Sequence, residues 1–463
     1  MREIISLQVG QCGNRIGEKF WKYVTDEHAI NRNGVYEGRD ADLELAKANV
    51  YFHEAVGGRY VPRAIMVDLE PSVVERVQCG CLGNMLRPDN FIYGQCGAGD
   101  NFIKGFHLGE DYRDEVMDAL RKEVERCDRM QGLQLTHSIG GGTGSGMGAL
   151  LMETIRNEYP NRILSTFSIV PSPRESNSVT ESLNALLSFH FMVDTTDATH
   201  CIDNEALLGI QDPKCRIQAG AYGDINRLVA ATMSGITACI RFPGQLNTDL
   251  RKLVTNLVPF PRSNFLMSSL APLNTTMFSS STVSELVREM FDVKNNMVSC
   301  NPFQGRYLTF AAIFRGRMSM NEVDQQILEL RRKKSRYFVD WIADHVKTAV
   351  CDIPLRDLKR SVTFLANNTS IHEVFKRVLN DFNTMKSITR RWRNRPIPFM
   401  HLQDGDIEDY GLEDAKSNVE NLVAEYQQYQ EVRTSDGPGE GERRRRRRRK
   451  KKRRRRRRSN KRS

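Results

Sequence analysis

The stretch LQLTHSIGGGTGSGMGALLMETIRNEY, residues 133–159, decides the fold of this chain. Its first residues alternate between apolar and polar side chains, which is the period of a β-strand, and this pattern stops at Gly140. From Ser145 onward apolar residues recur at helical spacing until Pro160 ends the pattern. The sequence therefore predicts a strand, a turn rich in glycine and a helix in direct succession.

The glycine run GGGTGSG, residues 140–146, is suited to binding a phosphate. It lies between a strand and a helix N-terminus, where backbone N–H groups and the positive end of the helix dipole converge. It is not a P-loop, because no lysine follows the last glycine, and it lacks the dinucleotide pattern GxGxxG with a downstream acid. A plain tight turn is the alternative interpretation. If phosphate binds here, the cation must come from elsewhere, such as a metal ion.

Two further glycine turns follow predicted strands, Gly10–Gly13 after Ile4–Val9 and Gly94–Gly99 after the short run Phe91–Tyr93. Three such turns after three strands indicate a doubly wound α/β sheet, whose ligands bind at the carboxyl ends of the strands. The ligand we expect is a nucleotide.

Carboxylates follow another predicted strand, Ala64–Leu69, which carries Asp68 and is followed by Glu70. These side chains could hold magnesium beside a phosphate. The alternative is that they are solvated turn residues, which is the commoner case for such acids in isolation.

Amides and an aromatic residue further along could hold a nucleobase. Asn204 and Asn226 can each donate and accept at a base edge, and Tyr222 can stack on the face of the base. Alone, either Asn is more typical of a cap or a turn. A long, mostly apolar helix over 225–240 should be buried between domains.

The length of 463 residues predicts two or three domains. No apolar run approaches ~20 residues, and the N-terminus does not read as a signal peptide, so we expect no membrane-spanning segment. The 10 cysteines show no paired spacing, which favours reduced thiols in the cytosol.

The net charge of +11 is unevenly distributed. Residues Arg443–Arg458 are sixteen consecutive Arg or Lys, and Lys461 and Arg462 follow them. Leaving aside these 18 of the 68 basic residues, the first 442 residues carry 50 basic against 57 acidic side chains, a formal charge of −7. An acidic body thus precedes a basic tail that should be disordered, because like charges repel and bury nothing.

The chain resembles the β-tubulins over nearly all of residues 1–433. The motifs that carry the resemblance are GGGTGSG, MREI, GQCGN, VDLEP, VPSP, CIDNEAL, RFPGQLN, FRGRMSM, TAVCDIP and EYQQYQ, in the family's order. The resemblance implies an α/β fold with a doubly wound GTPase domain, a long core helix, an α/β intermediate domain and a C-terminal helical hairpin. We place the GTP-binding domain at 1–205, the core helix and intermediate domain at 206–368, the helical domain at 369–433 and the disordered tail at 434–463.

The resemblance also implies a site for GTP or GDP with Mg²⁺. The residues that match the family's nucleotide contacts are Gln11, Cys12, Ser138, Gly142, Thr143, Gly144, Asn204, Tyr222 and Asn226. Tyr222 is expected to stack on guanine, and Glu70 to lie at the magnesium.

Catalysis in this family is shared between subunits, so the resemblance implies no catalytic residue in this chain for its own GTP. The next α-tubulin supplies a carboxylate that orients the attacking water. The corresponding loop of this chain carries Asn247, Asp249 and Lys252, and Lys252 stands where α-tubulin has a Glu. A lysine is not an anionic water-orienting group at neutral pH. The chain therefore looks like a β-type partner of α-tubulin, acting in microtubules of the cytoplasm.

Several positions depart from the family. Asp100 replaces an Asn near the terminal phosphate, where its carboxylate should repel the nucleotide, and Asn177 replaces an Asp near the ribose. The segment Asn274–Ser281 is about three residues shorter than the family's lateral-contact loop. The tail Arg443–Arg458 is basic where the family's tail is acidic.

The basic tail supports an alternative function, a protein on a tubulin scaffold that does not polymerise and that binds nucleic acid or anionic surfaces. Such binding should be nonspecific, because the tail holds no aromatic residue and no folded reading module. The nucleotide motifs favour the tubulin role, since a nucleic-acid-binding descendant does not need them.

Overall fold

The computed structural model describes residues 2–172, 180–210, 222–244, 249–273, 282–339, 341–342, 346–356, 358–391 and 411–431. The predictions for Asn177, Asn247, the segment 274–281 and the basic tail lie outside the described residues, as does the side chain of Tyr222.

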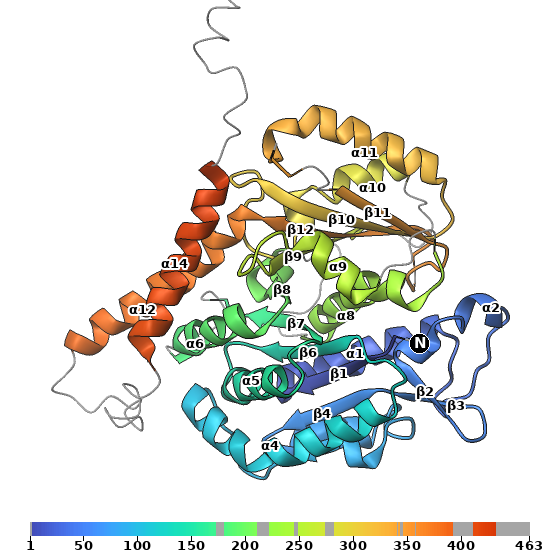
Figure 1. Cartoon of the computed structure of the whole chain (residues 1–463), viewed down its shortest axis with the longest axis horizontal. Helices are drawn as coiled ribbons and strands as arrows, with labels where there is room; N and C mark the ends of the chain where they lie inside the picture. The colour runs from blue at the N-terminus through green and yellow to red at the C-terminus, as the bar shows by residue number, and fades with distance from the viewer. Residues whose placement is uncertain are drawn as a thin grey trace, which may run out of the picture.

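Six parallel strands form the first part of the main sheet (Figure 1). They are β1 (Ile4–Val9), β4 (Ala64–Asp68), β5 (Phe91–Tyr93), β6 (Gly132–Ser138), β7 (Ile163–Val170) and β8 (Ala198–Asp203). Their order in the sheet is β5-β4-β1-β6-β7-β8, and every neighbouring pair is parallel. This is the order of a doubly wound sheet, with the change of direction between β1 and β6. The predicted fold class is confirmed.

The same sheet continues into the second half of the chain. The added strands are β9 (Phe265–Ala271), β10 (Tyr307–Arg315), β11 (Val346–Cys351) and β12 (Ser361–Asn368). β9 is parallel to β8, β12 is antiparallel to both β9 and β10, and β11 is parallel to β10. Within the described residues one ten-stranded sheet therefore spans both halves, which the sequence did not predict. A separate hairpin pairs β2 (Phe52–Ala55) with β3 (Arg59–Pro62).

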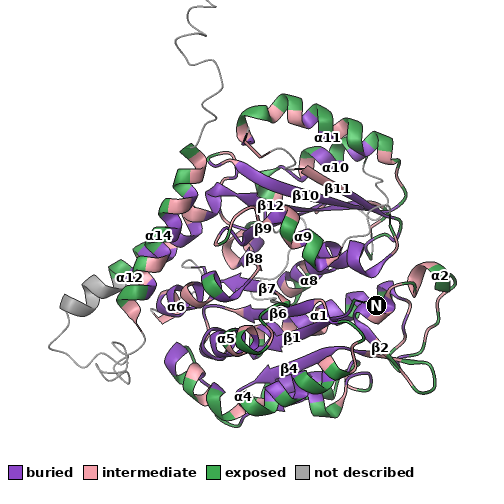
Figure 2. Ribbon diagram, viewed as in Figure 1, coloured by how far each residue is buried: buried purple, intermediate pink, exposed green. Residues whose placement is uncertain are grey.

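Helices cover both faces of the sheet, whose strands are almost wholly buried (Figure 2). One face packs on α4 (Phe102–Glu125), α5 (Gly148–Glu158), α6 (Thr180–Thr195), α12 (His372–Arg391) and α14 (Leu412–Glu431). The other face packs on α1 (Gly10–Glu27), α3 (Pro71–Gln78), α8 (Tyr222–Arg241) and α9 (Leu250–Leu257). Successive residues of a strand point to opposite faces, so Ile4 and Ile5 belong to different cores.

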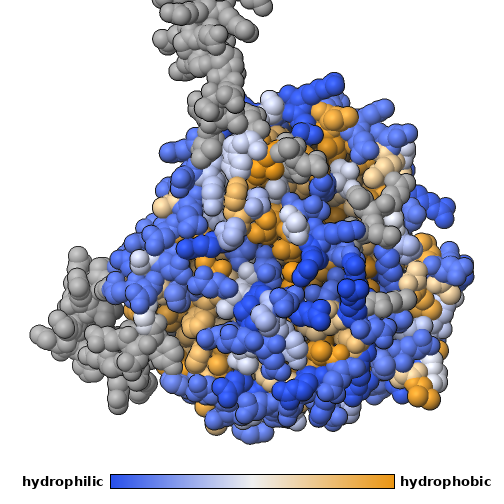
Figure 3. Space-filling model, in the orientation of Figure 1, coloured by the Kyte–Doolittle hydropathy of each residue, from blue (hydrophilic) through white to orange (hydrophobic). Residues whose placement is uncertain are grey.

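The remaining elements are shorter or belong to the second half. They are α2 (Ala41–Glu44), α7 (Asn204–Gly209), α10 (Val283–Glu289), α11 (Met320–Lys334), and the single turns Ala48–Val50, Pro88–Asn90, Thr143–Met147, Val293–Asn295, Ser335–Tyr337 and Thr369–Ile371. α10 and α11 pack on the sheet through a third core. Hydrophilic residues cover the edge of the molecule formed by α4 (Figure 3).

The glycine run differs slightly from its prediction. A π-type turn over Thr143–Met147 leads into α5, so helical structure begins two residues before the predicted start at Ser145. The hydroxyl of Ser145 donates to the carbonyl of Gly141 at 2.5 Å, so this side chain caps a backbone group within the turn.

The predicted core helix and C-terminal hairpin are both present. α8 carries Val229, Met233 and Ile236 into the core between α1 and the sheet. α12 and α14 lie side by side and pack together against α6 (Figure 1). No helix in the described part of the chain is long and apolar enough to cross a membrane.

Candidate nucleotide-binding site

A cavity of about 490 Å³ lies at the carboxyl ends of the central strands. Its walls come from the turns after β4, β5 and β6 and from the first turns of α1, α7 and α8, because α1 begins directly at Gly10. The structure brings the following predicted residues together in its lining: Gln11, Cys12, Glu70, Ser138, Gly142, Thr143, Gly144, Asn204 and Asn226. Residues separated by more than 200 positions thus meet at one edge of the sheet, where ligands of doubly wound folds bind.

The three glycine turns pack directly on one another. The amide of Gly142 donates to the carbonyl of Gly99 at 2.9 Å. Gly10 has a φ of +75°, and a Cβ there would lie 3.1 Å from the amide nitrogen of Gly144. A Cβ on Gly144 would lie 2.5 Å from the carbonyl oxygen of Ser138. These glycines are therefore required for the close approach of the backbones as well as for any ligand.

Gly141 differs from its neighbours in the run. It lines the cavity, and a Cβ built on it would meet no atom within 4 Å. At this position the absence of a side chain leaves space for a ligand, as a phosphate cradle requires.

Two polar side chains that the sequence analysis missed hold the turns in place. Asn184 of α6 donates to the carbonyls of Gly140 at 2.7 Å and Asp100 at 3.0 Å, so it joins two glycine turns. The ring nitrogens of His137 lie 2.8 Å from the carbonyl oxygen of Gly144 and 2.8 Å from the hydroxyl of Ser168. Burial lowers the pKa of His137 to about 4, so this ring is neutral near pH 7. The sequence did offer one signal for Asn184, because it is a polar residue on an otherwise apolar face of a helix.

Four carboxylates line the cavity, and one of them is deeply buried. Asp68 is 3% exposed, and its Oδ1 accepts from the amide of Leu69 at 2.8 Å, while its Oδ2 is buried with no hydrogen-bond partner in the described structure. Burial raises the pKa of Asp68 to about 6. Glu70, Asp100 and Glu181 also line the cavity.

These acids suit a cation that is held partly by a ligand. Among the described residues no group of three or more His, Cys, Asp or Glu side chains could hold a metal by itself. Mg²⁺ commonly binds through one or two carboxylates together with substrate phosphates. The unpartnered Oδ2 of Asp68 and the nearby Glu70 fit that requirement.

The lining also includes apolar side chains and the two amides. Ile16, Ile169, Ile225 and Val229 line it together with Asn204 and Asn226. Such a surface can bury a planar base, and amides can pair with its edge.

The position of Asn204 is fixed from a distant helix. Asp203, which precedes it, accepts from the amide of Glu205 at 3.0 Å and from Arg377 Nη2 of α12 at 2.6 Å. The sequence analysis did not foresee this contact, because it joins residues 174 positions apart.

Arg15 is a further lining residue that the sequence analysis missed. It is the one Lys or Arg among the described residues of the cavity wall. It follows Cys12 by three positions on α1, so both lie on the same helical face, and this spacing was the available signal. Burial raises the pKa of Cys12 to about 12, an effect that the charge of Arg15 partly opposes, so Cys12 is an uncharged thiol.

Asp249 and Lys252 lie at the other edge of the sheet. They were predicted to lie in a loop, but Asp249 directly precedes α9 and Lys252 lies in the first turn of this helix. The amide of Leu250, between them, donates to Gln131 Oε1 at 2.9 Å, and Gln131 directly precedes β6. Asp249 pairs with Arg2, which precedes β1. The cavity lies at the carboxyl ends of these same strands, so the predicted inter-subunit residues and the predicted nucleotide residues are on opposite edges.

Comparison with known families gives two matches. Residues 3–212 match the model of the GTPase domain of the Tubulin/FtsZ family, and residues 261–380 match that of the tubulin C-terminal domain. The cavity residues up to Asn204 fall within the first match, and those of α8 lie between the two. A match to this GTPase domain indicates that the ligand is a guanine nucleotide.

Proposed function

Since the chain belongs to the tubulin family, we propose that it is a β-type subunit that binds GTP or GDP with Mg²⁺ and pairs with α-tubulin. The heterodimer then joins other dimers in microtubules of the cytoplasm. The observation that carries this proposal is the cavity at the carboxyl edge of the sheet, whose lining contains the described residues expected for the nucleotide.

The phosphates are placed against the glycine turns. Gln11, Gly142 and Gly144 lie where helix N-termini and backbone amides converge, which favours negative charge. Glu70, with Asp68 beside it, is placed to hold Mg²⁺, which would neutralise the phosphates against the surrounding carboxylates. The guanine then lies between Asn204 and Asn226.

The opposite placement of cavity and loop supports assembly from head to tail. In a head-to-tail contact, one surface of a subunit meets a different surface of the next. Such stacking brings the loop of one subunit to the cavity of its neighbour. Here the first turn of α9 presents Lys252, which is exposed and cationic and therefore supplies no carboxylate for water activation. The GTP of the α partner is thus left intact, and this chain's own GTP is hydrolysed once an α subunit docks.

Co-sedimentation with purified α-tubulin in the presence of GTP tests the proposal, with the full chain compared with a version that ends at Glu442. We expect both versions to enter the polymer with bound guanine nucleotide. If neither version enters it, the proposed role is wrong.

The basic tail favours a second candidate function. Sixteen consecutive cations neutralise many phosphates, so the chain could retain nucleic acid or an anionic surface without sequence preference. Binding of a labelled RNA over a salt series, with the same two versions, tests this candidate. Tail-dependent RNA retention at physiological salt, together with no recovery of α-tubulin, would favour this second function over the role as a β-type subunit.

A further inference from the structure

Arg15 lines the cavity from α1, five residues after the start of that helix. α1 begins at Gly10, whose backbone lies against Gly144 of the glycine run. A residue five positions further along an α-helix lies about 7.5 Å further along its axis. The next residue on the helix, Ile16, belongs to the apolar part of the lining. The placement of Arg15 therefore favours contact with a base over contact with the terminal phosphates.

The guanidinium of Arg15 has unmet hydrogen-bonding capacity. Its Nε is buried and has no hydrogen-bond partner in the described part of the chain. A buried donor without a partner costs free energy, so a ligand that accepts from it gains affinity. A ligand with two adjacent acceptors suits the fork of an arginine best.

Guanine offers such a pair of acceptors. Its O6 and N7 lie side by side, and arginine binds them in a bidentate manner, whereas adenine places an amino donor at position 6. Asn204 and Asn226 are assigned to the base under the proposed function. Their amide oxygens can accept hydrogen bonds from the N–H donors of guanine.

We propose that Arg15 reads the O6 and N7 edge of the bound guanine and so selects guanine over adenine nucleotides. This inference rests on the proposed binding of a guanine nucleotide in the same cavity. Under this inference Arg15 contacts the base and does not neutralise the phosphates. Charge neutralisation at the phosphates is left to Mg²⁺.

The test compares the affinities of GTP and 7-deaza-GTP, which lacks the N7 acceptor, for the full chain and for R15M. We expect the full chain to bind GTP about tenfold more tightly than 7-deaza-GTP, and R15M to bind the two equally. The ratio of GTP to GDP affinity should be the same in both proteins. K19M is the matched control, because Lys19 lies on the same helix and outside the cavity, and it should retain the tenfold preference.

Other results would overturn the inference. A full chain that binds GTP and 7-deaza-GTP equally well rules out the N7 contact, even if R15M fails to fold. A change in the GTP to GDP ratio in R15M, with the 7-deaza preference kept, places Arg15 on a phosphate. A full chain that binds no guanine nucleotide contradicts the proposed function itself, and this inference falls with it.

Discussion

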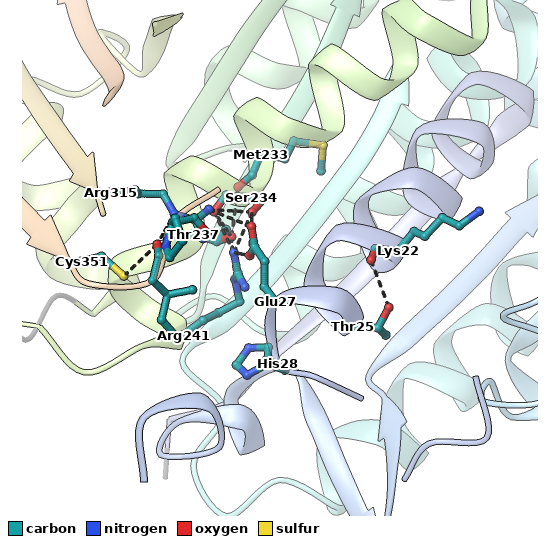
Figure 4. Close-up of polar contacts among 12 residues, drawn as sticks. Lys22, Thr25, Glu27, His28, Met233, Ser234, Thr237, Arg241, Arg315 and Cys351 are labelled. Atoms are coloured by element: carbon teal, nitrogen blue, oxygen red, sulfur yellow. Dashed lines mark hydrogen bonds and ion pairs between the residues drawn. The ribbon is translucent and has the colours of Figure 1, made fainter. Parts of the chain in front are cut away.

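The carboxylate of Glu27 lies 2.7 Å from Arg241 Nη2, and both side chains are almost wholly buried (Figure 4). Glu27 is the last residue of α1 and Arg241 the last of α8, and both helices begin at the nucleotide cavity. A second cation, Arg315 of β10, contacts the other oxygen of Glu27 at 2.9 Å, and the hydroxyl of Ser234 donates to the same carboxylate. The far ends of two cavity helices are thus tied to the strands of the second half of the chain.

This cluster carries two positive charges and one negative charge in the interior. Arg315 also donates to the carbonyls of Ile353 at 3.1 Å and Pro354 at 3.2 Å. Buried charges are stabilised only when they are paired and hydrogen-bonded, so the cluster depends on its single carboxylate.

Replacing Glu27 by Gln should therefore destabilise the protein strongly. E27Q leaves two buried guanidinium groups without a counter-charge, and we expect the free energy of unfolding to fall by about 3–5 kcal/mol. Denaturation in urea measures this loss. E75Q, at an exposed position of α3, is the matched control and should change stability by less than about 0.5 kcal/mol. A loss in E27Q no larger than that of the control would show that the ion pairs contribute little.

The same pair predicts how stability depends on pH. Burial alone would raise the pKa of Glu27, but Arg315 and Arg241 outweigh it and lower the pKa to about 2, against 4.5 for an ordinary Glu. A carboxyl whose pKa is lower in the folded state contributes stability above its unfolded pKa and loses it as the pH falls. The difference in unfolding free energy between the unmodified chain and E27Q should thus be constant from pH 7 to about pH 5 and shrink below pH 4.5. Urea denaturation across this range measures it, and a constant difference at all pH values would contradict the assignment.

Two glycines of the same run should respond differently to substitution. A Cβ on Gly146 would lie 2.1 Å from the carbonyl oxygen of Phe102, so G146A should destabilise the fold by about 3 kcal/mol. Gly141 has open space around its Cβ position, so G141A should fold normally. Its methyl group would enter the cavity, and we expect GTP affinity to fall by about tenfold or more. Thermal unfolding and equilibrium binding of GTP together separate the two effects. Unchanged GTP affinity in G141A would show that the phosphates do not contact this turn.

Removing the charge of Asp100 should tighten nucleotide binding. Asp100 is exposed and lines the cavity, where its carboxylate adds to the charge of Glu70 and Glu181. D100N removes one repulsive charge near the phosphates, and we expect the affinity for GTP to rise about fivefold at low salt, with a smaller gain at high salt. D111N, an exposed neighbour on α4 that does not line the cavity, should leave the affinity unchanged. Equal affinities for D100N and the unmodified chain would place the phosphates away from Asp100.

Replacing Lys252 by a carboxylate residue should allow the neighbouring α subunit to hydrolyse its GTP. Under the proposed function K252E presents an anion to the nucleotide of the next α subunit. The unmodified chain leaves this GTP intact, whereas we expect the K252E polymer to hydrolyse it. The nucleotide content of sedimented polymer measures this directly. K252Q removes the positive charge without adding a carboxylate and should keep the GTP intact. Retained GTP in K252E polymer would mean that this residue does not reach the neighbouring site.

Local patterns in the sequence were enough to predict the strands, turns and helices around the cavity. They also pointed to most of the residues expected in its lining. The alternation of residues 133–139, the glycine run and the helical spacing after it depend only on neighbouring residues, and so do the glycine turns after β1 and β5. Because the carboxyl ends of parallel strands meet at one edge, these local elements also implied a common site. The described residues among those predicted for the nucleotide do line one cavity.

Tertiary structure decided which other polar side chains meet at that cavity and behind it. Arg15, Asn184 and Glu27 stand on helices, where the sequence alone does not distinguish a solvated residue from one that faces a site. Their partners come from far away, as Arg315 does for Glu27 across 288 positions. The joining of both halves into one sheet has the same origin, because the pairing of β8 with β9 depends on how distant segments pack. Local sequence sets the backbone and its hydrogen-bonding groups, whereas the burial of a charge depends on the whole fold.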